Sequence, residues 1–160
     1  MKYSVTLRVN GKEQKLNLDA RATLLNALRE ILHLTGTKKG CDQGQCGSCT
    51  VLLNGKRVNS CLVLAVMADG KTVTTIEGVS SNGELHPLQQ SFLSHDGLQC
   101  GYCTPGQIVS ALGFLNEPWD KTPEAVQIGM SGNLCRCGAY PNIASAIEEI
   151  RSSIQEAASS

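Results

Sequence analysis

The sequence is poor in aromatic residues, has no excess of charge of either sign and contains no long apolar run. Aromatic residues make up 4% of the 160 residues, and hydrophobic residues of all kinds make up 41%. Burial of apolar surface alone is therefore a modest driving force for folding. Lysine and arginine number 14, as do aspartate and glutamate, which argues against a nucleic-acid-binding protein. No apolar stretch approaches the roughly 20 residues that a membrane-spanning helix needs.

The sequence also lacks motifs typical of a catalytic site and of an export signal. The sequence has no GxGxxG loop and no P-loop, and its serines and acidic residues are scattered without a triad. The first residues, MKYSVTLRVNG, alternate like a strand and contain neither an apolar export segment nor a twin-arginine pair. With Met1 as the native start, we expect a cytoplasmic protein with no catalytic residue and no nucleic-acid or membrane partner.

Eight cysteines are the most informative feature that is present. In the cytosol they would remain reduced rather than form disulfides. Their density lies below the ~8–10% typical of disulfide scaffolds. Clustered, reduced cysteines indicate metal ligands.

Local patterns in the first half predict strands and one helix. Residues 3–9 alternate between apolar and polar side chains, and Asn10-Gly11 supplies a hairpin turn after them. Thr23 is the expected N-cap of a leucine-rich helix that ends near Gly36. A second hairpin is expected around Asn54-Gly55, and residues 72–76 form a further strand.

From His86 onward the spacing predicts helices instead. The first covers residues 86–94, and the second begins at Thr104-Pro105, with the threonine as N-cap. Thr122-Pro123 repeats this start for a shorter helix. Pro141 opens the last helix, whose C-terminal tail is expected to fray.

A small, polar segment separates these two patterns. It covers residues 78–84, with the sequence GVSSNGE, and is the best linker candidate in the chain. We therefore expect one domain at 1–77 and a second at 85–160.

The first cysteine group lies in GCDQGQCGSC and continues to the far end of the second hairpin. Its spacing, C-x4-C-x2-C followed by a fourth cysteine, is that of plant-type ferredoxins with a 2Fe–2S cluster. Gly44 and Gly47 let the loop wrap tightly and bring backbone N–H groups toward sulfur. Zinc would favour two C-x2-C knuckles or added histidines, which this stretch lacks. The expected ligands are Cys41, Cys46, Cys49 and Cys61.

The second cysteine group joins a C-x2-C pair in QCGYC to a C-x-C pair in NLCRC. Each pair directly precedes a predicted helix start, where N-terminal amides offset negative charge. Four thiolates again suffice for one cluster, but the spacing alone leaves zinc open. The expected ligands are Cys100, Cys103, Cys135 and Cys137.

Together these motifs closely resemble the small iron–sulfur subunit of the xanthine oxidase family of molybdenum hydroxylases. The matching stretches are GCDQGQCGSCTVLLNGKRVNSC, LQCGYCTPGQIVSA and SGNLCRCGAYPNI, and the similarity extends over roughly residues 3–150. It is greatest to the separate bacterial subunits of aldehyde, N-heterocycle and carbon monoxide dehydrogenases. The resemblance implies an α+β chain, with an N-terminal β-grasp, plant-type ferredoxin-like domain and a C-terminal four-helix bundle. Each domain would bind a 2Fe–2S cluster.

The resemblance also implies partners and a direction of electron flow. A large subunit would carry a molybdenum–pterin cofactor, and a medium subunit would usually carry FAD. Electrons would pass from molybdenum to the cluster of the second cysteine group, then to that of the first, and onward to FAD or another acceptor. Gln99 and Cys137 match the family positions that lie beside the pterin.

Two other functions stay open beside the relay subunit. One is an independent soluble ferredoxin with two clusters, and the other is a zinc-bound interaction module without redox function. Tyr102 is expected to shield the second cluster from water, and Arg136 either offsets cluster charge or contacts the large subunit. The substrate belongs to the large subunit, with an aldehyde weakly favoured.

Overall fold

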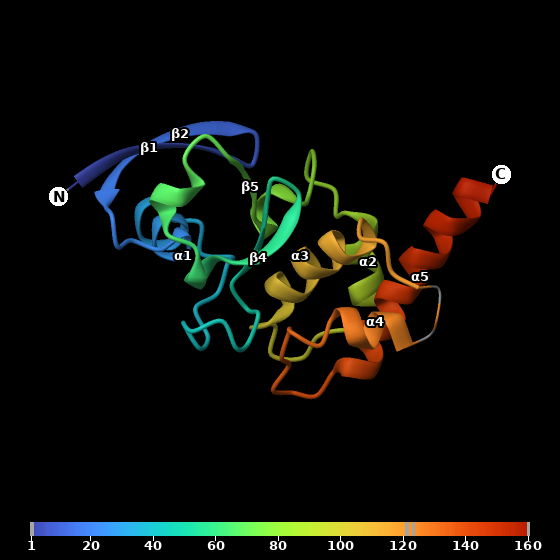
Figure 1. Cartoon of the computed structure of the whole chain (residues 1–160). Coiled ribbons are helices and arrows are strands. Elements are labelled where there is room, and N and C mark those ends of the chain that lie inside the picture. The colour runs from blue at the N-terminus through green and yellow to red at the C-terminus, as the bar shows by residue number, and fades with distance from the viewer. Residues whose placement is uncertain (1, 121, 123, 160) are drawn as a thin grey trace.

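A five-stranded sheet forms the framework of the N-terminal half of the computed structural model (Figure 1), which describes residues 2–120, 122 and 124–159. Its strands follow the spatial order β2-β1-β5-β3-β4. β1 and β5 run parallel, whereas the other neighbouring strands are antiparallel. The strands are β1 (Lys2–Val9), β2 (Lys12–Asp19), β3 (Thr50–Leu53), β4 (Lys56–Asn59) and β5 (Thr72–Thr74).

Both predicted hairpins are confirmed. Asn10 and Gly11 join β1 to β2 with φ angles of 50° and 80°, and Asn54 and Gly55 join β3 to β4 with 48° and 79°. Two successive residues in the left-handed region match the right-handed twist of a tight hairpin, which is why Asn-Gly suits both turns. The alternation predicted for the first strand places Val5, Leu7 and Val9 in the core.

The leucine-rich helix is shorter than predicted, and it changes from α-helical to π-helical geometry along its length. Thr23 caps it as expected, because its side chain accepts the N–H of Asn26, but α1 covers only Leu24–Asn26. A π-helical segment, Ala27–Ile31, follows and ends well before Gly36. The helix stops there because His33 adopts a φ of 56° and the N–H of Leu34 donates to the carbonyl of Leu28, as at other left-handed helix ends.

The C-terminal half is helical (Figure 1). Thr104 was predicted as the N-cap of α3, but Cys103 occupies that position and Thr104 is the first helical residue. The C-terminal tail was predicted to fray, but α5 remains helical to Ser159. In its first half, Ile143, Ala146 and Ile147 pack into the core. Of the predicted start at Thr122-Pro123, the proline lies outside the described residues. The helices are α2 (Pro87–Ser94), α3 (Thr104–Leu115), α4 (Glu124–Gly129) and α5 (Tyr140–Ser159).

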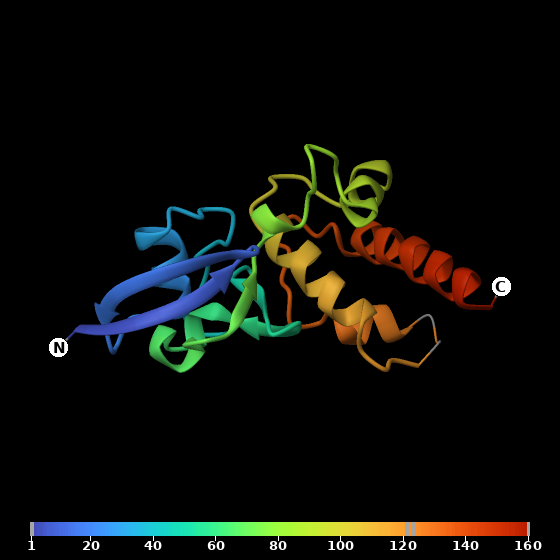
Figure 2. The ribbon, with the colours of Figure 1, turned by 90° about the horizontal axis from the view of Figure 1, so that it is seen from above.

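The helix α3 lies between the sheet and α5 and joins the two halves (Figure 2). Gly113 permits this approach, since a Cβ at that position would collide with the Arg57 side chain of β4. The guanidinium of Arg57 donates to both carboxylate oxygens of Glu117, at 2.8 and 2.5 Å, and to the carbonyl of Gly129 at 2.7 Å. One partly buried cation therefore connects β4 with segments at the ends of α3 and α4.

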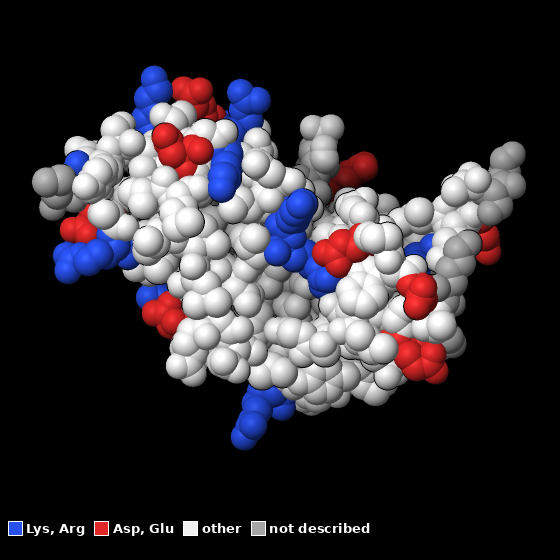
Figure 3. Space-filling view, in the orientation of Figure 1, with Lys and Arg blue, Asp and Glu red and all other residues white. Residues whose placement is uncertain are grey.

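The chain thus has a mixed α/β fold with one sheet and several helices. Among the described residues, no helix is both long and apolar enough to cross a membrane. Figure 3 shows positive and negative side chains interspersed over one face, without a large patch of one sign.

Candidate metal centres

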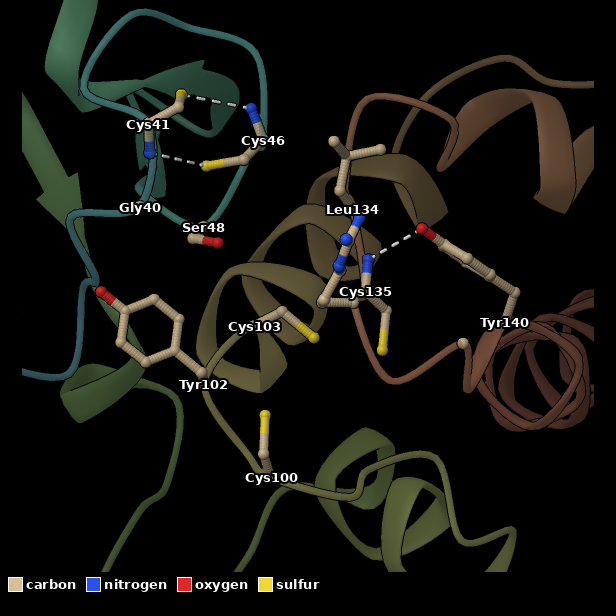
Figure 4. A pocket seen from close by; sticks show the side chains of 12 residues that line it. Gly40, Cys41, Cys46, Ser48, Cys100, Tyr102, Cys103, Leu134, Cys135 and Tyr140 are labelled. Atoms are coloured by element: carbon tan, nitrogen blue, oxygen red, sulfur yellow. Dashed lines mark hydrogen bonds between the residues drawn. The ribbon is translucent and has the colours of Figure 1, made fainter.

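All eight cysteines are free thiols, and within each predicted group thiols lie close enough to interact with one another. Residues of both groups line one cavity of about 670 Å³ at the junction of the sheet and the helices. Figure 4 shows Cys41 and Cys46 on one side of this cavity, with Cys100, Cys103 and Cys135 facing it from the other. The tertiary fold therefore brings the two groups, which lie far apart in sequence, next to each other.

The loop of the first cysteine group directs backbone N–H groups at sulfur. The N–H groups of Gln45 and Cys46 donate to Sγ of Cys41 at 3.2 and 3.4 Å, and the N–H of Cys41 donates to Sγ of Cys46 at 3.4 Å. The N–H of Gln43 is the largest of the influences that lower the pKa of Cys41 to about 7. Gly44, with a φ of 77°, supplies the left-handed turn that this wrapping needs. The loop is thus prepared for negative charge on its sulfurs.

The other two thiols of this group lie beneath the loop. Cys49 and Cys61 are buried with Leu25 in a small apolar cluster. Burial, reinforced by the neighbouring Cys49 thiol, raises the pKa of Cys61 to about 11. A bound cation would offset the cost of holding this thiolate away from water.

The second cysteine group likewise combines thiols that differ in burial, and it includes two exposed ones. Cys103, the N-cap residue of α3, has its pKa raised to about 12 by burial. The N–H of Tyr102 lowers the pKa of Cys100, which is exposed like Cys137. At Cys135 burial acts against the thiolate, but hydrogen bonds led by the N–H of Ala139 outweigh it and lower the pKa.

The two cysteine loops contact each other directly. The N–H of Leu134, next to Cys135, donates to the carbonyl of Cys46 at 2.9 Å. The hydroxyl of Tyr102 donates to the carbonyl of Lys39 at 2.8 Å. Tyr102 lines the cavity, as expected of a shielding residue, but this bond between the loops was not predicted.

Further residues support the second group without having been predicted. The hydroxyl of Tyr140 accepts the N–H of Cys135 at 2.9 Å, and the buried side chain of Asn133 reaches the first cysteine loop. Asn133 is the first residue of the NLCRC motif and Tyr140 follows three residues after its last cysteine, so both are neighbours of the expected ligands. Nothing in the local sequence, however, indicates which groups they bind.

Gln99 and Cys137, the two residues expected near a pterin, are both exposed. The thiols of Cys100 and Cys137 interact with each other. Gln99 precedes Cys100 in the chain, so it lies beside the exposed edge that these two cysteines form. Arg136 lines the cavity and is exposed, which fits both roles considered for it.

The donor set of each cysteine group is four thiols, which interact with one another within the group. Cys41 contacts Cys46, and Cys49 contacts Cys61. Cys103 interacts with Cys135, and Cys100 with Cys137. Four thiolates shared between two irons suit a 2Fe–2S cluster, whereas structural zinc gathers four ligands around one point.

Comparisons with known proteins agree with this arrangement. The model of a 2Fe–2S iron–sulfur cluster binding domain matches residues 7–75, and that of a [2Fe–2S] binding domain matches residues 75–148. The iron–sulfur-binding subunit PaoA of an Escherichia coli K12 aldehyde oxidoreductase is 54% identical, over 94% of this chain and 72% of that subunit. The chain belongs to the small iron–sulfur subunits of the molybdenum hydroxylases.

Other members of this family align over similar lengths. The small FeS subunit of nicotinate dehydrogenase from Eubacterium barkeri is 44% identical, over 91% of this chain and 93% of that subunit. The structure of quinoline 2-oxidoreductase from Pseudomonas putida 86 superposes with a TM-score of 0.87 at 45% identity, covering 91% of this chain and 90% of that one. Aldehyde oxidoreductase from Desulfovibrio gigas superposes with a TM-score of 0.89 at 44% identity, covering 96% of this chain and 17% of that larger one.

Membership in this family establishes the general role of the chain. It is an electron-transferring iron–sulfur subunit of an oxidoreductase.

Proposed function

We propose that this subunit relays electrons from a molybdenum–pterin cofactor on its large partner, through two 2Fe–2S clusters, to FAD on a medium subunit or to another acceptor. The second cysteine group would receive the electrons and the first would pass them on. The proposed ligands are Cys100, Cys103, Cys135 and Cys137 for the second group and Cys41, Cys46, Cys49 and Cys61 for the first.

The observation that carries this proposal is the direct contact between the two cysteine loops. One hydrogen bond of this contact, from the N–H of Leu134 to the carbonyl of Cys46, joins a residue next to one ligand set to a member of the other. When bound, the clusters would supply one-electron reduction and oxidation at iron. The chain itself holds them close together and keeps part of each ligand set away from water.

The distribution of exposed thiols supports the proposed direction. Cys100 and Cys137 are exposed beside Gln99, so an edge of the second cluster would be open to a partner. Leu134, Tyr102 and Tyr140 surround the cavity and are 48–49% exposed. Half-exposed apolar and aromatic side chains around a site are suited to be covered by another protein. We therefore place the large subunit on this rim.

The first cluster would have its own route to the surface. Residues 42, 43 and 45 of its loop are exposed, and they lie between the ligands Cys41 and Cys46. We propose that the FAD-bearing subunit, or another acceptor, docks over this segment. Electrons would then enter and leave at different places.

The finer description of the fold is also a proposal. The sheet with α1 corresponds to a β-grasp ferredoxin-like domain at 1–77, and α2–α5 to a four-helix bundle at 85–160, with 78–84 as the linker. The parallel pairing of β1 with β5 and the packing of α2, α3 and α4 against α5 support this division. We further propose an aldehyde as the substrate class of the complex, because PaoA belongs to an aldehyde oxidoreductase. The cytoplasmic location stays a prediction.

Anaerobic purification of the chain with whatever accompanies it tests the proposal. We expect about four irons and four acid-labile sulfides per chain, two distinct S = 1/2 EPR signals after dithionite reduction, and molybdenum in the same fraction. Two clusters without molybdenum or a large subunit would favour the independent ferredoxin. Zinc in place of iron would contradict the relay.

A further inference from the structure

The carbonyl of Gly47, between Cys46 and Cys49, accepts three hydrogen bonds. Two come from Thr50, whose N–H lies at 3.0 Å and whose hydroxyl lies at 2.6 Å. The third comes from Nδ2 of Asn133 at 3.0 Å. Asn133 is 86 residues away in sequence and belongs to the loop that carries the second cysteine group. Since a carbonyl has two lone pairs, this one is fully engaged.

The side chain of Asn133 is fixed in place. It is 7% exposed, and its amide also donates to the carbonyl of Gly106 at 3.3 Å. Its own backbone carbonyl accepts Nε2 of the buried Gln107 at 3.0 Å. These bonds hold the amide against the first cysteine loop.

The backbones around this contact approach one another closely. A Cβ on Gly47 would lie 2.5 Å from the carbonyl oxygen of Gly132, and a Cβ on Gly106 would lie 2.7 Å from that of Gly47. Real Cβ atoms do not approach other atoms so closely. Three segments therefore meet at a place where only glycine fits, and Asn133 connects all three.

We propose that Asn133 is a positioning residue for the first cluster, and that it raises the reduction potential of this cluster through the Gly47–Ser48 peptide. Donors on a carbonyl polarise the peptide and strengthen its N–H as a donor. In a trans peptide the N–H of Ser48 points away from the carbonyl of Gly47, and Ser48 lines the cavity with Cys41 and Cys46. N–H groups directed at a cluster favour its reduced, more negative state.

This inference rests on the proposed ligand sets and deepens them. It makes a residue of the second cysteine loop control the potential of the first cluster. The two potentials would then depend on the contact between the loops as well as on the ligands of each site.

The test is a redox titration followed by EPR on the iron-loaded subunit. Asn133→Ala removes one donor to the Gly47 carbonyl, and Thr50→Val removes another while keeping its shape. We expect both variants to shift the potential of the same EPR signal to lower values and to leave the other signal nearly unchanged. Asn142→Ala is the matched control, because its amide donates to the carbonyl of Asp96 at the surface. It should shift neither signal.

Two results would contradict the proposed role of Asn133. An unchanged potential in iron-loaded Asn133→Ala, or a shift only of the signal that Thr50→Val leaves unmoved, would overturn the inference. If Asn133→Ala does not retain iron, Asn133→Ser, which keeps a small donor, takes its place. Loss of iron in this variant as well would mark Asn133 as needed for folding and overturn the tuning role. Failure of the ligand assignment would appear earlier, as missing iron or a missing signal in the unchanged protein.

Discussion

At the scale of single residues, each cysteine group combines thiols whose pKa values are shifted in opposite directions. Cys61 is buried and Cys103 is partly buried, and both have raised pKa values, whereas Cys41 and Cys100 receive backbone N–H groups and have lowered ones. Burial makes a thiol resist ionisation unless a cation compensates the charge. The thiols with lowered pKa values are already disposed to bind metal as thiolates. A site of this kind binds strongly while keeping an accessible edge.

We expect Cys137→Ser to impair the second cluster more than the first. An alcohol is a poorer ligand for iron than a thiolate, and Cys137 belongs only to the second group. EPR of the reduced protein should lose or alter one signal and keep the other. Cys41→Ser is the matched variant and should affect the other signal. Unchanged spectra for Cys137→Ser would refute the ligand assignment.

At the scale of elements, glycines set how closely the helices approach the first cysteine loop. Gly106 lies in the first turn of α3, where alanine would ordinarily favour the helix by about 1 kcal/mol. Here a methyl group would meet the carbonyl of Gly47 at 2.7 Å and the backbone of Ser48 at 2.9 Å. Local propensity and tertiary packing therefore point in opposite directions, and packing decides.

Gly106→Ala should lower the free energy of unfolding by about 1–3 kcal/mol, because neither backbone can move aside. Urea unfolding of the iron-loaded protein measures this. Gly132→Ala is the control, since a Cβ there meets nothing within 4 Å, and we expect its effect to stay within about 0.5 kcal/mol. Equal stabilities for the two variants would mean that α3 is free to shift away from the loop.

The ion pair between β4 and the end of α3 should make stability depend on pH. Hydrogen bonds from Arg57 lower the pKa of Glu117 below its ordinary value of 4.5. The pair therefore stabilises the folded state fully above pH 4.5, and this contribution is lost as the pH falls through the lowered pKa. Because the Glu117 side chain is 36% exposed, solvent screening limits the gain to roughly 1 kcal/mol.

Glu117→Gln tests this dependence. In urea unfolding at pH 7, the unchanged protein should have a higher free energy of unfolding than the variant. This difference should shrink below pH 4.5. Taking the difference between the two proteins at each pH cancels the acid sensitivity of the clusters that they share. A difference that stays constant with pH would contradict the role of the carboxylate charge.

Local sequence patterns predicted the two hairpins and the helix cap at Thr23, because residues close in sequence determine these features. Tertiary contacts decided the rest. The bond from Asn133 to Gly47 joins residues 86 apart, and no periodicity in the chain reports such a contact.

At the scale of the whole molecule, the two halves meet at the metal centres. The sheet and the helices each have a separate apolar core, and the contacts between the cysteine loops lie where these halves join. Sequence motifs located each group of four cysteines, and the resemblance placed them in one electron path. Only the fold shows that hydrogen bonds from Leu134 and Tyr102 connect the two loops.

Removal of iron should therefore loosen the junction before it loosens either core. A chelator under reducing conditions should lower the urea midpoint, because metal binding and folding are coupled. Amide hydrogen exchange should rise first in residues 38–49 and 133–138. Equal protection of these segments with and without iron would show that the loops are held without the clusters.

The exposed edge of the second cysteine group constrains the order of assembly. Cys100 and Cys137 are accessible in the isolated subunit, while Cys103 and Cys135 are more deeply placed behind them. A scaffold protein that delivers a preformed cluster can reach this edge only while nothing covers it. With the large subunit docked on this rim as proposed, insertion of the second cluster would have to precede docking, and a complex assembled too early would be trapped without that cluster.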